Sequence, residues 1–466
     1  MFIHSIHRRN AAILGLATLL SACGGGGTTA TNAGSTDLTV TATGAGSDLG
    51  ENSTHNALAA IQSTETNDMP RRIASAVVAL TYASPKVAVV DYSKIETAAR
   101  RTRLAKYNLA IIGIDTQQTP LYLSQVAAAI KSANPATKIA QYTSVGQVRD
   151  DLAAQAATLT SSDWWLRNTA GDRVQLAPEW NAYETNMTDW APADANGQRW
   201  PQWKATYDAT TTFQQVPQID YVFTDSVMYQ NVTADWQRIS ADQTVADTAV
   251  QDATRRGFAS YWDTLRSLSP GLKMMGNAHT DLLASPEIKG KLEGAFLEAM
   301  MGKSWSYGTW AGWSKMMDIY RTAIRNTIAP KLVVFHMYVP SATDYALVRY
   351  GIASALLEDG HFAVNTDNLS EELPWYDEFS APLGTPVDPP PTGPIASGIY
   401  WRRYTNGLVL VNPTAVKGTI NIGTGHRRIV GTLDPAVNTG LPQSMITLGP
   451  KQGLVMLKVR SALNPI

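Results

Sequence analysis

Eight short apolar runs, separated by longer amphipathic segments, constrain the fold of this chain more than any other feature of its sequence. Such alternation is typical of βα units, in which consecutive strands lie parallel in one sheet. The expected strands are residues 87–92, 108–115, 138–144, 220–225, 273–279, 294–300, 331–338 and 361–365. Eight repeats predict an α/β fold of the closed (β/α)8 TIM-barrel type.

Helical patterns fill most of the gaps between these runs. They cover residues 120–133, 255–268, 314–328 and 342–358. The alternative architecture is an open, doubly wound sheet, for which a glycine-rich phosphate-binding turn would point to a nucleotide. The chain contains neither G-x-G-x-x-G nor G-x-x-x-x-G-K-[ST], which favours the barrel.

The connection between the third and fourth strands is unusually long, about 75 residues, and loops of this length are usually functional. It carries six of the thirteen tryptophans, which argues against disorder. We expect it to cover one mouth of the barrel. The six tryptophans are Trp164, Trp165, Trp180, Trp190, Trp200 and Trp203.

A second, smaller unit is expected after the barrel. Residues 381–394 are rich in proline and glycine and contain three consecutive prolines, which cannot lie in a helix or a central strand. Residues 395–466 alternate short β-type runs with Gly, Pro and Asn turns, which predicts a small antiparallel β-sandwich. The barrel itself is therefore assigned to residues 72–380, with 381–394 as a linker.

The N-terminus predicts export and attachment to a membrane. Residues 1–23 combine Arg8 and Arg9 with a short apolar run and end in "LSAC", which resembles the lipobox of bacterial lipoproteins. Cys23 would then be lipidated, residues 24–71 would form a flexible stalk, and the protein would lie in the cell envelope, secreted and lipid-anchored. The alternative is an ordinary secretory signal with an incidental cysteine.

Composition narrows the classes of partner. Cys23 is the only cysteine, so the folded part can have no disulfide, no thiolate metal site and no cysteine nucleophile. A net charge of -1 gives no electrostatic case for nucleic acid. We expect a small or neutral partner, no cofactor and no metal.

Two carboxylates at strand ends could carry chemistry. The active site of a barrel lies at the carboxyl ends of its strands, where Asp225 ends the fourth run and Glu298 lies in the sixth. A buried carboxylate must be paired, hydrogen-bonded or facing a polar cavity. Two such groups in one cavity are what glycoside hydrolysis needs. A helix-capping role remains the alternative for Asp225.

Other residues at the same edge could bind a sugar, because aromatic rings stack on its C–H faces and polar groups bind its hydroxyls. The substrate would be a polysaccharide or an oligosaccharide. Each tryptophan could equally be a core residue. The candidate substrate-binding residues are Asp91, Tyr92, Asp115, Tyr142, Trp164, Trp165, Asn186, Asn277, His279, Trp305, Tyr338 and Asn365.

The order of several motifs resembles hypothetical glycosyl hydrolase family 15. The motifs are "DWWLRNTAGDRV", "NMTDW", "IDYVFTDSV", "GAFLEAMMG" and "YWRRYTNGLVLVNPT", and the resemblance covers roughly residues 75–460. It implies a distant relative of the retaining barrel glycosidases, with Asp225 as nucleophile and Glu298 as acid/base. The C-terminal unit similarly resembles the β-sandwich that follows the barrel in many α-glycosidases.

Three other functions remain open from the sequence. A non-catalytic polysaccharide-binding lipoprotein would use the same fold and tryptophans without needing a pair of close carboxylates. A metal-dependent hydrolase would use His279, His336 and Asp225, although no H-E-x-x-H motif occurs. A Ser-His-Asp hydrolase is disfavoured because the chain has no G-x-S-x-G elbow.

Overall fold

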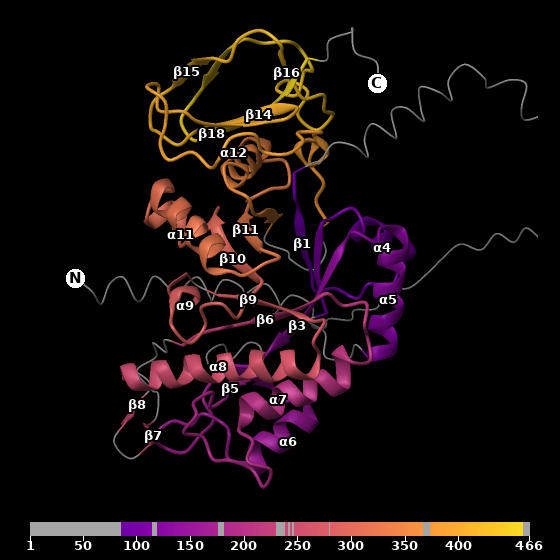
Figure 1. The fold of residues 1–466 in the computed structure, drawn as a ribbon, viewed down its shortest axis with the longest axis vertical. Helices are drawn as coiled ribbons and strands as arrows, with labels where there is room; N and C mark the ends of the chain where they lie inside the picture. The colour runs from indigo at the N-terminus through magenta and orange to yellow at the C-terminus, as the bar shows by residue number, and fades with distance from the viewer. Residues whose placement is uncertain are drawn as a thin grey trace, which may run out of the picture.

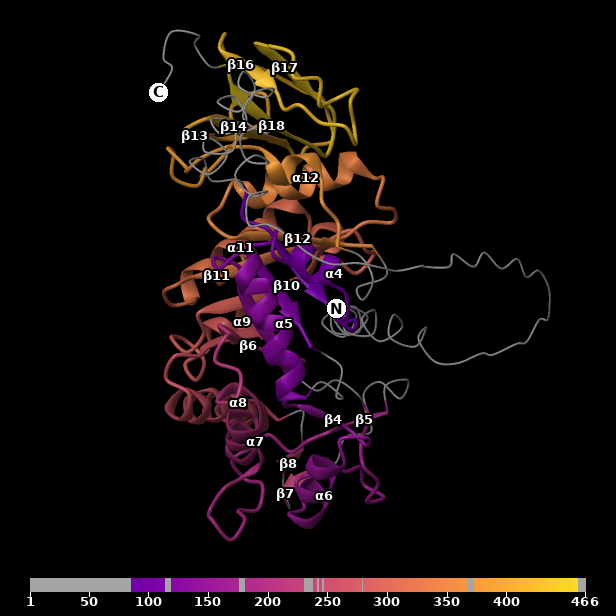
Figure 2. The same ribbon diagram turned by 90° about the vertical axis from the view of Figure 1, so that its right-hand side faces the viewer.

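The computed structural model describes residues 85–113, 119–175, 181–229, 238–240, 243–244, 247–278, 280–366 and 373–459. Figures 1 and 2 show an elongated arrangement with the large sheet in the middle. The C-terminal strands, coloured yellow, lie at one end, and helices α6 (Ala153–Ser161) and α7 (Trp200–Asp208) lie at the other.

Eight parallel strands form the central sheet, and each lies within one of the eight predicted runs or extends it by one residue. A parallel bridge between Val87 and Phe362 joins the first and last strands, which brings the sheet to near closure. The predicted barrel is therefore confirmed. In sheet order the strands are β1 (Ala88–Asp91), β2 (Leu109–Ile112), β3 (Lys138–Ser144), β6 (Tyr221–Asp225), β9 (Lys273–Asn277), β10 (Gly294–Met301), β11 (Leu332–Tyr338) and β12 (His361–Asn365).

Alternation along each strand decides which side chains fill the barrel. In β6, Tyr221 and Phe223 belong to the interior cluster, whereas Val222 packs with the residues under the helices. Asp225 follows Tyr221 and Phe223 at intervals of two residues and therefore lies on the same face of the strand. Its carboxyl group thus faces the interior at the end of β6. The apolar pattern of the strand thus fixes the direction of its one charged group.

Helices cover the outside of the sheet. Thr119 accepts a hydrogen bond from the backbone N–H of Tyr122, and Pro120 occupies the first turn, so both residues favour a helix start there. Two further helices are short, α9 (Thr280–Ala284) and α10 (Tyr307–Trp310). The longer helices are α4 (Ala98–Leu104), α5 (Pro120–Ala133), α8 (Thr248–Leu268), α11 (Trp313–Asn326) and α12 (Tyr345–Leu356).

The long connection between β3 and β6 packs into the same hydrophobic cluster as the outer face of the barrel and its helices. It contains an antiparallel pair, β4 (Gln147–Arg149) with β5 (Ala182–Glu184), and a π-helix, η3 (Ala209–Phe213), that continues α7. The rings of Trp200 and Trp203 stack 5.5 Å apart, and Trp164 lies 6.3 Å from Trp200. Several of its tryptophans therefore pack against one another.

The C-terminal strands form two antiparallel sheets, as predicted. One has the order β13-β14-β18-β16 and the other pairs β15 with β17. Gly453 of β18 lies against α12, where a Cβ would come within 2.5 Å of the carbonyl oxygen of Arg349, so only glycine fits. The strands are β13 (Tyr400–Tyr404), β14 (Gly407–Asn412), β15 (Gly418–Asn421), β16 (His426–Arg428), β17 (Met445–Leu448) and β18 (Gln452–Lys458).

Two other short elements complete the described fold. Strands β7 (Arg238–Ser240) and β8 (Gln243–Thr244) pair after β6, and a 3-10 turn, η4 (Asp377–Ser380), precedes the C-terminal strands. Within the described ranges, no helix is both long and apolar enough to cross a membrane.

Several predicted features fall outside the described residues. They are the signal segment with Cys23, the stalk, Asp115 and His279. The proposed domain boundaries also stay predictions.

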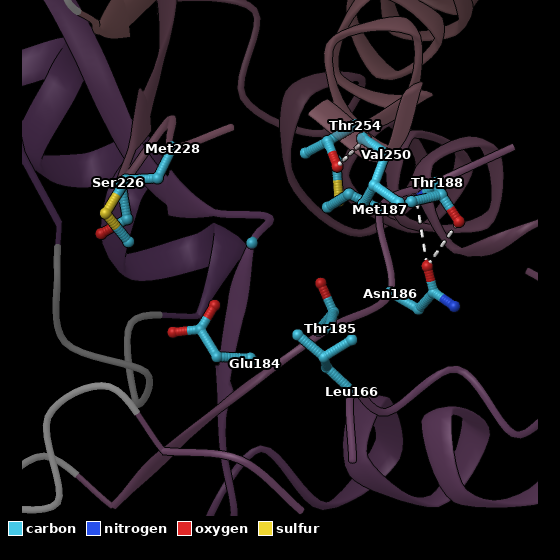
Figure 3. Close-up of a pocket in the computed structure, with 11 residues that line it drawn as sticks. Leu166, Glu184, Thr185, Asn186, Met187, Thr188, Ser226, Met228, Val250 and Thr254 are labelled. Carbon is cyan, nitrogen blue, oxygen red and sulfur yellow. Dashed lines mark hydrogen bonds between the residues drawn. The ribbon is translucent and has the colours of Figure 1, made fainter. Parts of the chain in front are cut away.

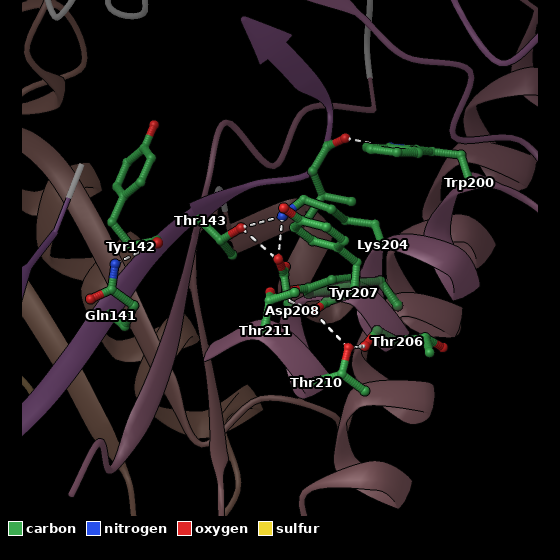
Figure 4. A network of polar contacts seen from close by, with 12 residues as sticks. Gln141, Tyr142, Thr143, Trp200, Lys204, Thr206, Tyr207, Asp208, Thr210 and Thr211 are labelled. Atoms are coloured by element: carbon green, nitrogen blue, oxygen red, sulfur yellow. Dashed lines mark hydrogen bonds and ion pairs between the residues drawn. The ribbon is translucent and has the colours of Figure 1, made fainter. Parts of the chain in front are cut away.

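A buried polar network fastens the helices of the long connection to the barrel. On α7, the Nζ of Lys204 lies 2.5 Å from the Oδ1 of Asp208 and donates to Thr143 on β3 at 2.9 Å (Figure 4). Tyr261 of α8 donates to the Oδ2 of Asp208 at 2.8 Å. One strand further along, the indole N–H of Trp262 donates to Thr224 of β6 at 3.0 Å. The outer faces of β3 and β6 are thus tied to α7 and α8.

Breaking this network should destabilise the protein strongly. Asp208→Ala leaves the Lys204 ammonium buried without its carboxylate, so we expect the free energy of unfolding to fall by about 3–5 kcal/mol. Urea unfolding followed by circular dichroism measures the change. Asp151→Ala, which removes the exposed ion pair with Arg149, is the control and should cost less than about 1 kcal/mol. Equal losses in the two variants would contradict the assignment.

Candidate active site

One asparagine links the two predicted catalytic carboxylates. The Nδ2 of Asn277, at the end of β9, donates to the Oδ1 of Asp225 at 2.9 Å and to the Oε2 of Glu298 at 3.0 Å. Because both oxygens lie that close to one nitrogen, they can be no more than about 5.9 Å apart. The fold therefore brings the two carboxyl groups together across β9.

Two tyrosines bind the remaining carboxylate oxygens. The hydroxyl of Tyr142 on β3 donates to the Oδ2 of Asp225 at 3.0 Å. The hydroxyl of Tyr338 on β11 donates to the Oε1 of Glu298 at 2.9 Å. Each carboxylate is therefore bound through both oxygens, and its orientation is fixed.

These five residues come from five neighbouring strands, β3, β6, β9, β10 and β11. Each lies at or near the carboxyl end of its strand, which is where barrel enzymes place their active sites. The apolar runs alone made each residue a candidate, and closure of the barrel makes them neighbours.

A residue in the left-handed backbone region follows each carboxylate. Ser226 and Ala299 both have φ of +52°, which is uncommon for residues other than glycine. Such conformations persist where the surrounding structure imposes them, and they gather at functional sites. Here they turn the chain immediately after Asp225 and after Glu298.

Burial and proximity raise the pKa of Glu298 to about 7. The larger cause is loss of water around its carboxyl group, and the negative charge of Asp225 adds to it, while hydrogen bonds from Asn277 and Tyr338 oppose it. Burial also raises the pKa of Asp225, opposed by hydrogen bonds from Asn277, the Ser226 backbone and Tyr142. The environment thus favours one protonated and one ionised carboxyl group near neutral pH.

A third tyrosine lies beside the pair. Tyr92 is buried, and its ring meets that of Tyr142 edge to face at 5.5 Å. Burial and the charges of Asp225 and Glu298 hold the pKa of the Tyr92 hydroxyl well above 10, so this hydroxyl stays protonated. It is available as a hydrogen-bond donor near both carboxylates.

The loop after β10 brings Trp305 to the same place. Its ring lies 6.1 Å from that of Tyr338, edge to face, and it packs on the residues that fill the barrel interior. The Nζ of Lys303 lies 4.9 Å from the centre of the Tyr338 ring, and burial lowers the pKa of this lysine. The predicted residues Tyr92, Tyr142, Asn277, Trp305 and Tyr338 are therefore all gathered around Asp225 and Glu298.

Two predicted tryptophans do not reach the site. Trp164 is fully buried and donates to the carbonyl oxygen of Pro192 at 2.6 Å. Trp165 is 3% exposed and donates to the hydroxyl of Thr160 at 2.9 Å. Their indole N–H groups are used within the long connection, which corrects the expectation that these rings face a sugar.

Three polar candidates also have other partners. Asp91 is fully buried and accepts hydrogen bonds from Ser93 and Arg100, so its carboxylate stabilises the start of the first connection. The side-chain oxygen of Asn186 accepts from the backbone N–H and the hydroxyl of Thr188, which closes a local turn. The structure corrects the predicted sugar contact of Asp91, whereas Asn186 also lines a pocket next to the segment after Asp225, so its predicted role stays a prediction. Asn365 instead contacts His336 inside the barrel.

A pocket that encloses about 370 Å³ of empty space, open solvent included, lies beside the segment that follows Asp225, and neither Asp225 nor Glu298 is among its lining residues. Met187 and Glu184 line it from the long connection, and Ser226 and Met228 line it from the segment after Asp225. Figure 3 shows the Glu184 carboxyl group directed toward the side where Ser226 and Met228 lie. Burial raises the pKa of Glu184 to about 8, although Gln147 donates to it at 2.6 Å. This acid is therefore uncharged at neutral pH.

Glu184 was not among the predicted site residues. The one sequence signal for it is alternation, because Ala182 and Glu184 share the buried face of β5 while Tyr183 is less buried. Three residues are too short a run to distinguish this pattern from chance.

The described residues offer no evident binding group for a metal. Among them, no three His, Cys, Asp or Glu side chains gather as a group that could coordinate one. The acids of the site are instead bound by amide and phenol donors.

Comparison with known proteins places these residues in a family. A model of hypothetical glycosyl hydrolase family 15 matches residues 131–408, whereas a search of curated proteins finds no match. Among solved structures, the chain is similar to the glycoside hydrolase domain of PelA from Pseudomonas aeruginosa, with 17% identity and a TM-score of 0.40 over 63% of this chain and 97% of that one.

Two further solved structures are similar at lower identity. An Anoxybacillus alpha-amylase has 9% identity and a TM-score of 0.46, with 78% of this chain and 90% of that chain covered. Eubacterium rectale Amy13B has 9% identity and a TM-score of 0.49, with 83% and 99% covered.

The family match spans more than half of the chain and takes in both carboxylates, Asp225 and Glu298. It confirms the resemblance that the sequence motifs predicted. The chain therefore belongs to hypothetical glycosyl hydrolase family 15, and its enzyme class is that of the glycosidases.

Proposed function

We propose that this glycosidase retains the anomeric configuration of its substrate, with Asp225 as nucleophile and Glu298 as acid/base. The observation that carries the proposal is the shared hydrogen-bond donor, Asn277, which limits the two bound oxygens to about 5.9 Å. Retaining enzymes have carboxyl groups about 5–5.5 Å apart, whereas inverting enzymes need about 6.5–9.5 Å to admit a water molecule.

In the first step, a carboxylate oxygen of Asp225 attacks the anomeric carbon as the glycosidic C–O bond breaks. The proton of Glu298 passes to the departing oxygen, so the leaving group departs as an alcohol. Burial supports this division of roles, because it raises the pKa of Glu298 to about 7, so this group still carries a proton at pH values below about 7.

In the second step, water attacks the same carbon and the bond to Asp225 breaks. Glu298, now ionised, takes a proton from that water and returns to its starting state. Asn277 contacts both acids throughout and keeps them at the spacing that both steps require.

We propose an extracellular or envelope polysaccharide as the substrate, and Cys23 as the site of lipid attachment. The secretory N-terminus with its "LSAC" ending supports this location. Trp305 and Tyr338 support a sugar polymer as ligand, because aromatic rings beside polar groups suit carbohydrate rings.

Substitution of either acid should remove most of the activity. Asp225→Ala should lower kcat by at least about 10³-fold, because no covalent intermediate can form. Glu298→Gln should lower kcat by about 10²–10⁴-fold on natural glycosides and less on 4-nitrophenyl glycosides, whose leaving group needs little protonation. Assays on a panel of 4-nitrophenyl glycosides and polysaccharides measure both, with proton NMR to assign the first-formed anomer.

The control for these substitutions is Asp318→Asn, since Asp318 is an exposed acid on α11. It should leave kcat unchanged. An inverted first product, or full activity of Asp225→Ala, would refute the retaining assignment.

The rate should fall on the alkaline side as Glu298 loses its proton. Only the protonated acid can assist the leaving group, so kcat/KM should decline as pH rises through about 7. Tyr338→Phe removes a hydrogen bond that lowers the pKa of Glu298, so the decline should move to higher pH. Initial rates between pH 4 and 10 test both expectations, and an alkaline limb that Glu298→Gln leaves in place would exclude Glu298 as its source.

Lipid attachment can be tested separately from catalysis. Cys23→Ser should move the full-length protein from the membrane pellet to the soluble fraction of expressing bacteria, because an acylated cysteine anchors a chain that a hydroxyl cannot. Mass spectrometry of the wild-type N-terminus should find an acylated Cys23. An unmodified cysteine, or pelleting that Cys23→Ser does not change, would argue for an ordinary secretory signal.

A further inference from the structure

The strand that carries Glu298 is interrupted by a bulge. Up to Leu297, β10 pairs regularly with β11, opposite Phe335, but the next pair joins Met301 to Met337. Four steps along β10 therefore match only two along β11. The left-handed residue Ala299 lies within this bulge, directly after Glu298.

A buried histidine binds the backbone of this bulge. The Nδ1 of His336 lies 3.2 Å from the backbone nitrogen of Ala299, which has no place in the regular ladder. A backbone N–H in the dry interior needs an acceptor, and His336 provides it. His336 itself is completely buried on β11.

The remaining contact of the ring fixes its protonation state. Because a backbone N–H can only donate, Nδ1 must accept, and the proton of the neutral ring must lie on Nε2. The Nε2 lies 3.1 Å from the side-chain oxygen of Asn365 on β12, which can accept that proton. Burial also lowers the pKa of His336 to about 3, so the ring stays neutral at working pH.

We propose that His336 and Asn365 are positioning residues that hold the bulge, and with it the carboxyl group of Glu298, in the catalytic geometry. This inference rests on the proposed role of Glu298 as acid/base. His336 acts only through its neighbours, because its ring lies one layer below the carboxylates and has both nitrogens engaged.

His336 supports Glu298 by two routes. The first is the hydrogen bond to Ala299, the residue that follows Glu298. The second is packing, because the ring of Tyr338 lies edge to face on His336 at 4.8 Å, and the Tyr338 hydroxyl donates to Glu298. Phe296, 4.9 Å away on β10, closes the other side. Loss of the imidazole would therefore loosen both the backbone at Ala299 and the Tyr338 hydroxyl that donates to Glu298.

The same contacts bear on the metal-hydrolase alternative. One nitrogen of His336 accepts from Ala299 and the other donates to Asn365. Neither has a lone pair free for a metal ion, so the structure assigns His336 to positioning.

The test uses the full chain with His336→Leu, His336→Gln and a control, His361→Leu. Leucine fills part of the space but leaves the Ala299 N–H without an acceptor, and we expect kcat to fall by about 10²-fold with little change in KM. Glutamine can accept from Ala299 and donate to Asn365, so it should recover most of the rate. The alkaline limb of His336→Leu should move to higher pH as the Tyr338 hydrogen bond weakens.

His361 is another buried barrel histidine, 8% exposed where His336 is 0% exposed, with Nδ1 unpartnered among the described residues, and it is absent from the contacts of Glu298. His361→Leu should therefore reduce stability without moving the alkaline limb. If His336→Leu changes stability, kcat and pH profile no more than His361→Leu does, the positioning role is wrong. If His336→Leu does not fold, Asn365→Leu, which removes only the outer contact, must show the same loss of kcat and shift for the proposal to stand.

A readout independent of activity separates this proposal from the proposed function. Hydrogen exchange of the Ala299 amide, measured by NMR, should accelerate in His336→Leu and return toward wild type in His336→Gln. If exchange responds in this way but Glu298→Gln remains fully active, the proposed function fails while the contact stands. If exchange is unchanged, the positioning proposal fails whatever the activity of the Glu298 variant.

Discussion

The site depends on one amide nitrogen placed between two buried carboxyl groups. Two carboxylates this close repel each other, and burial removes the water that would screen them. The Nδ2 of Asn277 offsets part of that repulsion by donating to Asp225 and Glu298 together. Burial and the residual repulsion raise the pKa of Glu298, so one group is protonated when the other is charged. The contact with Asn277 and the closeness that it maintains thus set both the spacing of the two carboxyl groups and their different protonation states.

Contacts on the outer face of the barrel strands keep these groups in place. Alternate residues of the same strands face outward, where Thr143 and Thr224 bind side chains of α7 and α8. Their neighbours in the chain, Tyr142 and Asp225, face the site. A shift of either helix would therefore move Thr143 or Thr224 and, through one peptide bond, the adjacent site residue Tyr142 or Asp225. The bulge in β10 interrupts the regular pairing beside Glu298, and His336 accepts a hydrogen bond from the backbone N–H of Ala299 within it.

The sequence predicted which residues lie at the strand ends but not which side chains they contact. Asp225 and Glu298 could be predicted because each interrupts an apolar run, where an unpaired charge would be costly. The long connection was less predictable. Trp164 and Trp165 suggested a sugar platform, yet they are buried in the hydrophobic cluster that joins that segment to the barrel, since an indole suits either environment equally well. Asp91 likewise ends a strand, but Arg100, nine residues later, binds its carboxylate.

The sequence by itself determined the eight strands, four of the covering helices and the strand-end position of Asp225, because apolar runs and helical periodicity are local properties of the chain. Only the tertiary structure decided that Asn277 lies between two acids from other strands, that Glu184 and Ser226 line one pocket, and that His336 binds Ala299. Those contacts join residues far apart in sequence. They arise when the sheet curves toward closure, and no local pattern encodes the distance across a barrel.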